Sequence, residues 1–334
     1  MIPETRERRL KTRLLLASMA AMATAAVLAG PVHAQNYPTH AVKIIVPFPA
    51  GGSADGMPRL IGDWLSRKWK QPVVIENRPG AAGNIGTNEV FKAKPDGYTL
   101  LSAPPPPLVI NQNLYAKLSF DPAKFEPIIL ISRIPNSLMV NPKNVPVKTL
   151  PEFIARAKAE PGKITSAIQG NGTTSDLTSK MFEMMAGVKF TYIPYTGTAP
   201  ALNDLVGGTT DAMFDNLGVS LPQAKAGRLR LIAVASPKRI AALPDVPTIA
   251  ETLPGFDSSA WYAVVAPPGT PKAIVDKINA DINEALKDPA ILAKLANYTA
   301  EPIGGTPEET AKTMKEDVAR WKDVMEKAHV PKIK

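Results

Sequence analysis

Short apolar runs alternate with amphipathic stretches along the chain from about residue 40 onward. This alternation is typical of parallel strands joined by crossover helices. The first pair is a strand over residues 42–46, ended by Pro47 and Pro49, and a helix with apolar side chains at helical spacing between Leu60 and Trp69. The pattern therefore predicts an α/β fold.

The same pattern continues to the C-terminus. A helix with Pro271 near its start carries one apolar face, and a last helix begins near Thr306 and passes Trp321. Further strands are predicted over residues 73–75, 98–101, 127–140, 164–168, 190–194, 212–214, 229–234 and 261–266.

Two of these strands, 127–140 and 261–266, divide the alternating units into two sets. We expect them to cross between two lobes joined by a hinge. The predicted lobes are residues 35–134 plus 256–334, which form a discontinuous lobe 1, and residues 135–255, which form lobe 2. Each lobe should be a mostly parallel sheet flanked by helices.

Four consecutive prolines follow the third strand, at Pro104 to Pro107. Proline lacks a backbone donor and is excluded from helix interiors and central strands. The sequence therefore predicts an extended loop here.

The first 34 residues have the composition of an export signal. Basic residues between Arg6 and Arg13 precede an apolar run of about 15 residues, and Val32-His33-Ala34 provides a small-residue cleavage site. A membrane anchor is the alternative, but a spanning helix needs roughly 20 apolar residues. We expect cleavage near Ala34, the general secretory route and a mature protein in the periplasm.

Charge and cysteine content agree with an exported protein. Removal of residues 1–34 leaves 34 basic and 28 acidic residues, a formal charge of +6. This mild surplus favours encounter with anions, and no basic run with interleaved aromatic residues suggests nucleic acid. The chain has no cysteine, which fits a fold that needs no disulfide.

Catalytic motifs are not visible. The three histidines are His33, His40 and His329, so a histidine-assisted serine has no partner in the fold, and no G-x-S-x-G elbow occurs. The scarcity of histidine and cysteine leaves only carboxylates for a metal site. Dinucleotide and phosphate loops are also absent. We predict no catalytic residues, no metal and no cofactor.

Two similar loops remain, each between a strand and a helix: Pro49-Ala-Gly-Gly-Ser53 and Gly170-Asn-Gly-Thr-Thr174. Glycine lets backbone N–H groups approach a ligand, and a helix N-terminus offers unpaired donors. The two loops could grip an anion from both sides. The alternative is that Ser53, Thr173 and Thr174 are ordinary helix caps and the glycines serve tight turns.

Taken in order, several segments resemble the Bug family, the extracytoplasmic binding proteins of tripartite tricarboxylate transporters. They are Val42-Lys-Ile-Ile-Val-Pro-Phe-Pro-Ala-Gly-Gly-Ser-Ala-Asp55, Val74-Ile-Glu-Asn-Arg-Pro-Gly-Ala-Ala-Gly-Asn-Ile-Gly86, Lys94-Pro-Asp-Gly-Tyr-Thr-Leu-Leu101, Pro194-Tyr-Thr-Gly197 and Leu243-Pro-Asp-Val-Pro-Thr248. The resemblance implies a two-lobed periplasmic binding protein, or Venus flytrap, that holds a small carboxylate partly through ordered waters.

The resemblance also implies ligand-binding positions on both lobes. Ser102, at the end of the third strand, is a further candidate. The first-lobe positions are Phe48, Pro49, Ala50, Gly51, Gly52, Ser53 and Asp55, and the second-lobe positions are Gly170, Gly172, Thr173, Thr174, Tyr195, Gly197 and Asp215.

The chain departs from the family pattern at Gly56 and Pro58, early in the first helix, and at Pro104 to Pro107. A stiff apolar wall at the prolines would suit an aromatic or alkyl acid better than citrate. The expected function is a monomeric periplasmic receptor that delivers a carboxylate, aromatic or dicarboxylic, to membrane permease subunits. A sensor acting on a sensor kinase and an exported α/β enzyme are the alternatives.

Overall fold

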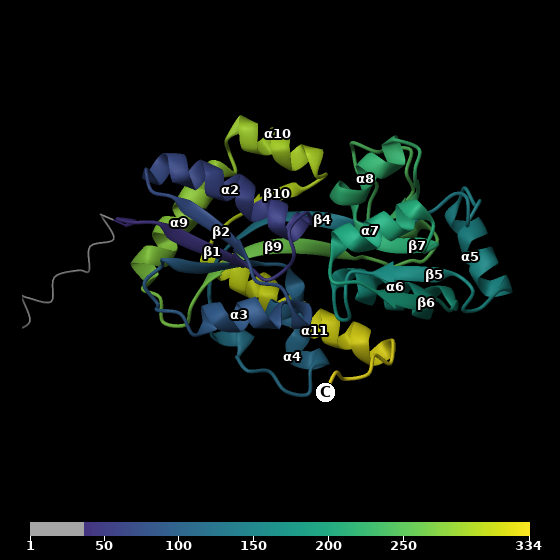
Figure 1. Cartoon of the computed structure of the whole chain (residues 1–334), viewed down its shortest axis with the longest axis horizontal. Helices are drawn as coiled ribbons and strands as arrows, with labels where there is room; N and C mark the ends of the chain where they lie inside the picture. Colours follow the sequence, from purple (N-terminus) through teal and green to yellow (C-terminus); the bar gives the residue numbers. More distant parts are fainter. Residues whose placement is uncertain (1–36) are drawn as a thin grey trace, which may run out of the picture. The chain divides into compact units, whose positions relative to one another are not determined.

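Two β-sheets that share one long strand organise residues 37–334, the part of the chain that this computed structural model describes (Figure 1). The predicted export signal, residues 1–34, lies outside the described residues. The shared strand is β4 (Glu126–Val140), and β9 (Ser259–Ala266) runs antiparallel beside it.

The first sheet has the strand order β2-β1-β3-β9-β4, with β10 added on β4. Its parallel part is formed by the three strands that open the described chain. Besides β4 and β9, this sheet contains β1 (Val42–Val46), β2 (Val73–Asn77), β3 (Thr99–Ala103) and β10 (Glu301–Gly304).

The second sheet forms on the C-terminal part of β4, which pairs with both β7 and β8. Its strands are β5 (Thr165–Ile168), β6 (Thr191–Pro194), β7 (Ala212–Asn216) and β8 (Arg230–Val234). All pairings that avoid β4 and β9 are parallel, and all pairings that include one of them are antiparallel. Parallel pairing therefore characterises the outer strands, and the crossing strands make both sheets mixed.

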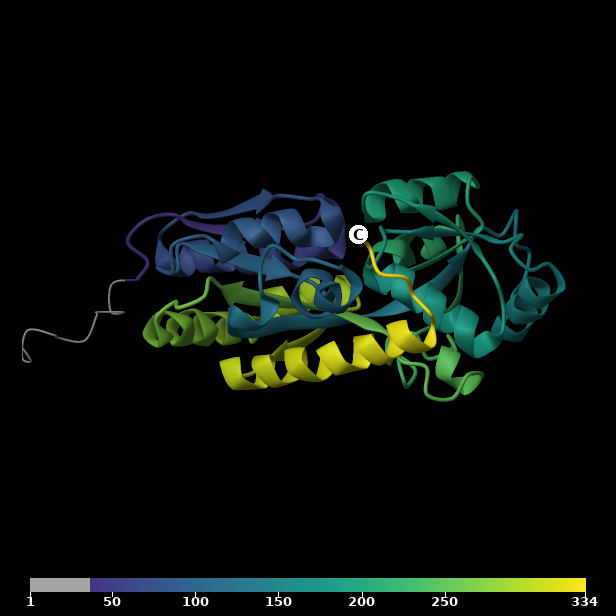
Figure 2. The same cartoon turned by 90° about the horizontal axis from the view of Figure 1, so that it is seen from below.

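Helices connect the strands, and one of them links both sets of elements. Figure 2, seen from below, shows α11 (Pro307–Lys327) along the underside, with the C-terminal segment turning back toward the space between the sheets. The other α-helices are α2 (Ser53–Trp69), α3 (Asn84–Phe91), α4 (Asn111–Leu114), α5 (Leu150–Ala159), α6 (Thr174–Ala186), α7 (Thr198–Gly207), α8 (Leu217–Lys225), α9 (Lys272–Ala285) and α10 (Pro289–Asn297).

Each sheet has its own apolar core. Trp261 and Trp321 lie fully buried in the cluster that covers the first sheet, and Phe153, Phe182 and Phe214 lie in the cluster of the second. Val324 of α11 packs against both clusters. The C-terminal helix therefore ties the two cores together.

The pairing of β4 changes partway along the strand. Residues up to Pro135 pair with β9, and residues from Asn136 onward pair with β7. The boundary predicted between residues 134 and 135 lies beside this change. The division into lobe 1 and lobe 2 stays a proposal, because residues 38–334 form one compact unit.

The strand predictions are confirmed with small shifts at the ends, and β1 has the predicted bounds. The prediction of an extended loop at Pro104 to Pro107 is wrong. Pro105 already has helical angles (φ −49°, ψ −38°), and a π-helical turn spans Pro106–Ile110 before α4. The first turn of a helix needs no backbone donor, and the proline ring presets a helical φ, so prolines are accommodated there.

Within residues 37–334, no helix combines the length and the apolar character needed to cross a membrane.

A glycine allows the second sheet's α8 to touch the loop after α10. A Cβ atom placed on Gly218 would lie 2.0 Å from the carbonyl oxygen of Tyr298. The next residue, Thr299, has a left-handed backbone (φ 50°). Only a residue without a side chain permits this backbone approach.

We expect Gly218→Ala to destabilise the protein by about 1–3 kcal/mol, as overpacking does, even though alanine is the better helix former. The measurement is the free energy of unfolding in urea. Gly207→Ala is the matched control, because no atom lies within 4 Å of the Cβ position at Gly207 of α7. Equal stability of the two variants would contradict the packing role of Gly218.

Candidate functional site

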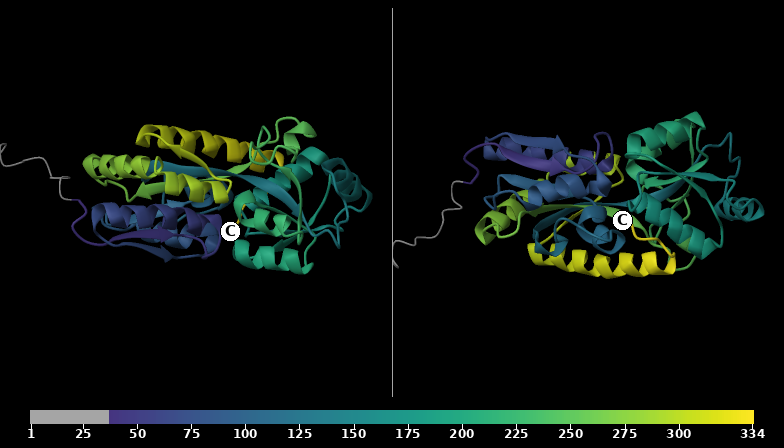
Figure 3. Two further views of the ribbon diagram at one scale, coloured as in Figure 1. Left: turned by 90° about the horizontal axis from the view of Figure 1, so that it is seen from above. Right: turned by 60° about the horizontal axis from the view of Figure 1, so that its bottom comes forward.

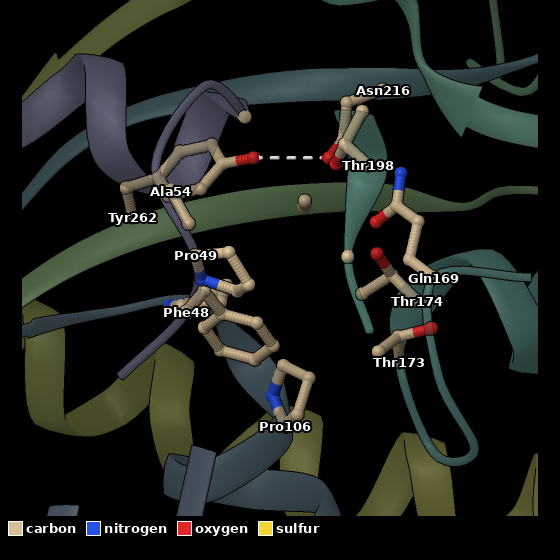
Figure 4. A pocket seen from close by; sticks show the side chains of 14 residues that line it. Phe48, Pro49, Ala54, Pro106, Gln169, Thr173, Thr174, Thr198, Asn216 and Tyr262 are labelled. Atoms are coloured by element: carbon tan, nitrogen blue, oxygen red, sulfur yellow. Dashed lines mark hydrogen bonds between the residues drawn. The ribbon is translucent and has the colours of Figure 1, made fainter. Parts of the chain in front are cut away.

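A cleft of about 440 Å³, its opening included, lies between elements of the two sheets (Figure 4). Residues from both sheets face each other across it. The lining consists of Phe48, Pro49, Gly52, Ala54, Pro104, Pro106, Gln169, Thr173, Thr174, Gly197, Thr198, Asn216, Ala260 and Tyr262.

The loop after β1 and the start of α7 are in direct contact across the cleft. A Cβ atom on Gly52 would lie 3.0 Å from Oγ1 of Thr198, and one on Gly197 would lie 3.1 Å from Cγ of Pro49. The sequence predicted that the loop at Gly51 and Gly52 would face the loop at residues 170–174. In the structure its close neighbours are residues 197–199, so the two sides are closed on each other here.

Three helices begin at this cleft without a side chain to cap them. The N-cap residues are Gly52 for α2, Gly197 for α7 and Asn216 for α8. None of them has a side chain that accepts a hydrogen bond from a backbone N–H of the first helical turn. The first N–H groups of a helix have no intrahelical acceptor and carry partial positive charge. The three ends together offer donors to an anion from both sheets.

The start of α6 is different, although its sequence resembles the first loop. Thr173 caps the helix by accepting from the N–H of Asp176, and the Asp176 carboxylate accepts from the N–H of Gly172 at 2.8 Å. A Cβ atom on Gly172 would lie 2.2 Å from Cδ2 of Leu114. Gly172 thus serves a close packing contact outside the cleft, while the Thr173 and Thr174 side chains line the cleft.

Asp55 also lies outside the cleft lining and braces the first loop. Its carboxylate accepts from the N–H of Gly51 (3.2 Å), Nε of Arg59 (2.9 Å) and Nδ2 of Asn77 (2.9 Å). Asn77 also donates to the carbonyl of Phe48. Burial raises the pKa of Asp55, but the bonds from Arg59, Asn77 and Gly51 outweigh burial, and the net shift is downward. The charged carboxylate therefore holds the loop in shape.

Tyr262 and Asn216 form the floor of the cleft. The Tyr262 hydroxyl donates to Oδ1 of Asn216 at 3.2 Å, the dashed line in Figure 4. Asn216 in turn donates to Oδ1 of Asn136, on the part of β4 that joins the second sheet. Burial raises the pKa of Tyr262 far above its ordinary value, against a smaller lowering by the Ser53 hydroxyl. Tyr262 therefore stays a protonated donor between the sheets.

A buried carboxyl group lies behind this floor. Asp215, fully buried at the end of β7, accepts a hydrogen bond from Nε2 of Gln169, whose side chain lines the cleft. Burial raises the pKa of Asp215 to about 7, although the Gln169 bond and the nearby Asn216 N–H act to lower it. Near neutral pH the group is therefore divided between its charged and neutral forms.

An apolar wall stands opposite these polar groups. Figure 4 shows the rings of Phe48, Pro49 and Pro106 on one side and the side chains of Gln169, Thr173 and Thr174 on the other. No Lys, Arg or His lines the cleft. Over residues 37–334, no group of three or more His, Cys, Asp or Glu side chains is arranged to hold a metal ion. An anion here would meet backbone, amide and hydroxyl donors.

The remaining predicted residues surround the cleft. Gly170 and Tyr195 line a neighbouring outer cavity, and Tyr195 donates to Oδ2 of Asp204 (2.7 Å). Burial raises the pKa of Tyr195 to about 12. Ala50 and Gly51 are exposed, and Ser53 and Ser102 are buried without reaching the lining.

Six of the predicted residues thus line the cleft: Phe48, Pro49, Gly52, Thr173, Thr174 and Gly197. The ligand role of each predicted residue stays a prediction. Sequence reasoning missed Ala54, Gln169, Thr198, Asn216, Ala260 and Tyr262 as lining residues. Thr198 and Asn216 follow turn signals before helices and could have been found. Ala260 and Tyr262 belong to a buried apolar strand and carry no local signal.

The comparisons with known protein families and with individual proteins indicate the same family. Residues 57–330 match the model of the tripartite tricarboxylate transporter family receptor, TctC. Protein BugT of Bordetella pertussis is 37% identical over 317 residues, which cover 94% of this chain and 97% of that protein.

Solved structures agree with the sequence matches. A protein of R. palustris solved with adipate has a TM-score of 0.86 and 37% identity, covering 89% of this chain and 100% of that one. The periplasmic binding protein BugD has a TM-score of 0.84 and 34% identity, covering 89% and 100%. MatC from Rhodopseudomonas palustris, solved with malate, has a TM-score of 0.81 and 33% identity, covering 86% and 99%.

These relatives share the two-lobed α/β fold of periplasmic binding proteins, so the fold predicted from the sequence is confirmed. The family binds and does not catalyse. The chain belongs to the TctC or Bug family of periplasmic solute-binding proteins, the receptors of tripartite tricarboxylate transporters.

Proposed function

We propose that this chain captures a small carboxylate in the cleft between its two sheets and hands it to the permease of a tripartite transporter. The observation that carries the proposal is the meeting of three uncapped helix N-termini, at Gly52, Gly197 and Asn216, in a cleft without a cationic side chain. Such a site binds an anion through fixed dipoles and N–H donors.

The donors come from both sheets, and this couples binding to closure. α2 belongs to the first sheet's connections, and α7 and α8 belong to those of the second. A carboxylate that touches all three binds the closed arrangement better than an open one, so the ligand shifts the population toward closure. Water molecules would bridge the donors that do not reach the ligand directly.

Two relatives support a carboxylate, since one was solved with adipate and another with malate. The family's description as a transporter receptor supports the proposed delivery to a permease. We further propose that residues 1–34 are removed near Ala34 on export and that the mature chain acts as a monomer in the periplasm. N-terminal sequencing and gel filtration of the periplasmic protein test these two points.

The purified mature chain should be stabilised thermally by small carboxylates and should not consume them. At a ligand concentration 100 times Kd, binding adds about 2.7 kcal/mol to stability. A thermal-shift screen with adipate, malate and benzoate measures this, and chromatography of the recovered ligand measures turnover. A carboxylate that is converted to product would replace the binding role with an enzymatic one.

Gly52→Val should abolish stabilisation by carboxylates and leave the fold intact. Gly52 has φ −96°, which valine tolerates, but a Cβ atom there already lies 3.0 Å from Thr198 Oγ1, so the branched side chain would fill the cleft. Calorimetric titration measures the loss of binding, and circular dichroism checks the fold. Ala50→Val, in the same loop but exposed, is the control that should bind normally. Normal binding by a folded Gly52→Val protein would remove this loop from the site.

Asp215→Asn should change how stability depends on pH. The native pKa of Asp215 is about 7, above the ordinary value near 4, so from pH 4 to 7 the folded state holds a proton that the unfolded chain has released. The free energy of unfolding of the natural protein therefore falls as pH rises from 4 to 7. Asp215 contributes at most about 1.4 kcal/mol to this fall for each pH unit. The variant should lack this contribution and gain relative stability toward pH 8. Urea unfolding at several pH values measures it, and parallel curves would contradict the assignment.

A further inference from the structure

A second, larger cavity adjoins the cleft. It has about 1040 Å³ of empty space, its opening included, and we call it the outer chamber. It shares Phe48, Pro49 and Gln169 with the cleft, so the two spaces adjoin at these residues. Its other lining residues are Pro47, Pro79, Gly80, Ala81, Ala82, Gly83, Tyr115, Gly170, Asn171, Tyr195, Thr196 and Ile333.

The Phe48 ring stands at the junction of the cleft and the chamber. A Cβ atom on Gly83 would lie 3.2 Å from Cε2 of Phe48 and 3.1 Å from Cγ of Pro107, so the glycine backbone packs against both rings. Phe48 is half-buried and belongs to both linings. Its face is therefore available to the part of a ligand that passes from one space to the other.

The chamber wall beside Phe48 has an unusual backbone. The four residues from Gly80 to Gly83 all have positive φ, including 47° at Ala81 and 49° at Ala82. Left-handed angles in residues with a side chain cost of order 1–3 kcal/mol each and gather at ligand sites. The strain shapes this wall without placing a bulky side chain in it.

The C-terminal tail closes another side of the chamber. Ile333 donates its N–H to the carbonyl of Leu114 (2.9 Å) and accepts from the N–H of Ala116 (2.8 Å). Figure 3 shows the C-terminus between the two halves of the fold, where these bonds hold it. Ile333 lines the chamber beside Tyr115, and both residues also pack against the apolar core of the first sheet.

The chamber presents more apolar surface than the cleft, although neither space is lined by a charged side chain. None of its lining residues is Lys, Arg, His, Asp or Glu, and proline, alanine, aromatic and isoleucine side chains supply much of its surface. An uncharged aromatic or alkyl group would be desolvated favourably there, whereas a second carboxylate would have no ionic partner.

We propose that the outer chamber holds the uncharged body of the ligand, and that this chain's ligand is a monocarboxylate with an aromatic or extended alkyl group. This inference rests on the proposed function, because the ligand's carboxylate is held in the adjoining cleft. The C-terminal Ile333 and the left-handed loop at residues 80–83 then determine how long a ligand fits.

A matched ligand series tests the chamber on the natural protein. Propanoate, hexanoate, 4-phenylbutanoate and adipate are compared by calorimetry at one pH. Hexanoate and 4-phenylbutanoate should bind more tightly than propanoate, by about fourfold for each methylene group placed in the chamber. Adipate, which equals hexanoate in carbon number but carries a second charge, should bind more weakly than hexanoate. Equal or tighter binding of adipate would overturn the assignment.

Variants of the tail separate the chamber from the cleft. Ile333→Trp should fill the chamber, weaken 4-phenylbutanoate at least tenfold and leave propanoate unchanged. Lys332→Trp is the control, because its side chain lies in a different groove with Asn113 and Lys322. Ile333→Ala, which keeps the tail's backbone bonds, should weaken 4-phenylbutanoate less. If Ile333→Trp does not fold, the affinity of Ile333→Ala for 4-phenylbutanoate is the test. An unchanged affinity would then contradict the role of the chamber.

The outcomes distinguish the two proposals. If no carboxylate binds the natural protein, the proposed function fails. If propanoate binds as tightly as 4-phenylbutanoate and the Ile333 variants change neither, the carboxylate function stands and the outer chamber has no part in it.

Discussion

The proposed site depends on three helix starts whose N-cap residues make no side-chain capping bond. Gly52, Gly197 and Asn216 begin three helices, and none of them provides the usual capping bond. Unpaired donors at a helix end are normally satisfied by side chains or water, so three such ends in one cleft favour an anionic guest. Because the ends belong to two sheets, the site is complete only when both sides are together.

Close backbone approach makes this meeting geometrically possible. Gly52 lies against Thr198, Gly197 against Pro49 and Gly218 against the Tyr298 carbonyl. A side chain at any of these glycines would hold the two sides apart. Asp55 adds a second requirement, because its bonds to Gly51, Arg59 and Asn77 fix the loop that brings Gly52 into place. Asp55 thus positions the loop, and the proposed ligand donors are backbone N–H groups.

The lack of cations in both the cleft and the outer chamber gives the two spaces different preferences. In the cleft, we propose that the three helix ends take the place of a basic residue, above a floor in which Tyr262 donates to Asn216. Beyond Phe48 the lining combines proline, alanine and isoleucine side chains with the uncharged polar side chains of Asn171, Tyr195 and Thr196. Asp215, whose pKa burial raises to about 7, lies behind the cleft floor and accepts a hydrogen bond from Gln169, whose side chain lines the cleft.

The sequence by itself determined every described strand except β10, the first helix and the family. Local periodicity and turn residues set those elements, and β1 has the bounds read from Val42 to Val46. Sequence reasoning also found Phe48, Pro49, Gly52 and Gly197, because strand ends followed by glycine mark loops at the edge of a sheet. It failed at Pro104 to Pro107, where three of four consecutive prolines occupy helical turns rather than an extended loop, because proline is accommodated at a helix start.

Only the tertiary structure decided which loops meet. The loop before α6 resembles the first loop in sequence, yet Thr173 caps α6 and Gly172 packs on Leu114, whereas α7 and α8 supply the open ends. Tyr262 reaches the cleft from an apolar strand more than 200 residues after Phe48, and Ile333 lines the chamber from the C-terminus. Periodicity indicates how a segment folds on itself. The packing of distant segments decides which group a backbone donor or a strand side chain contacts, and no local pattern encodes that packing.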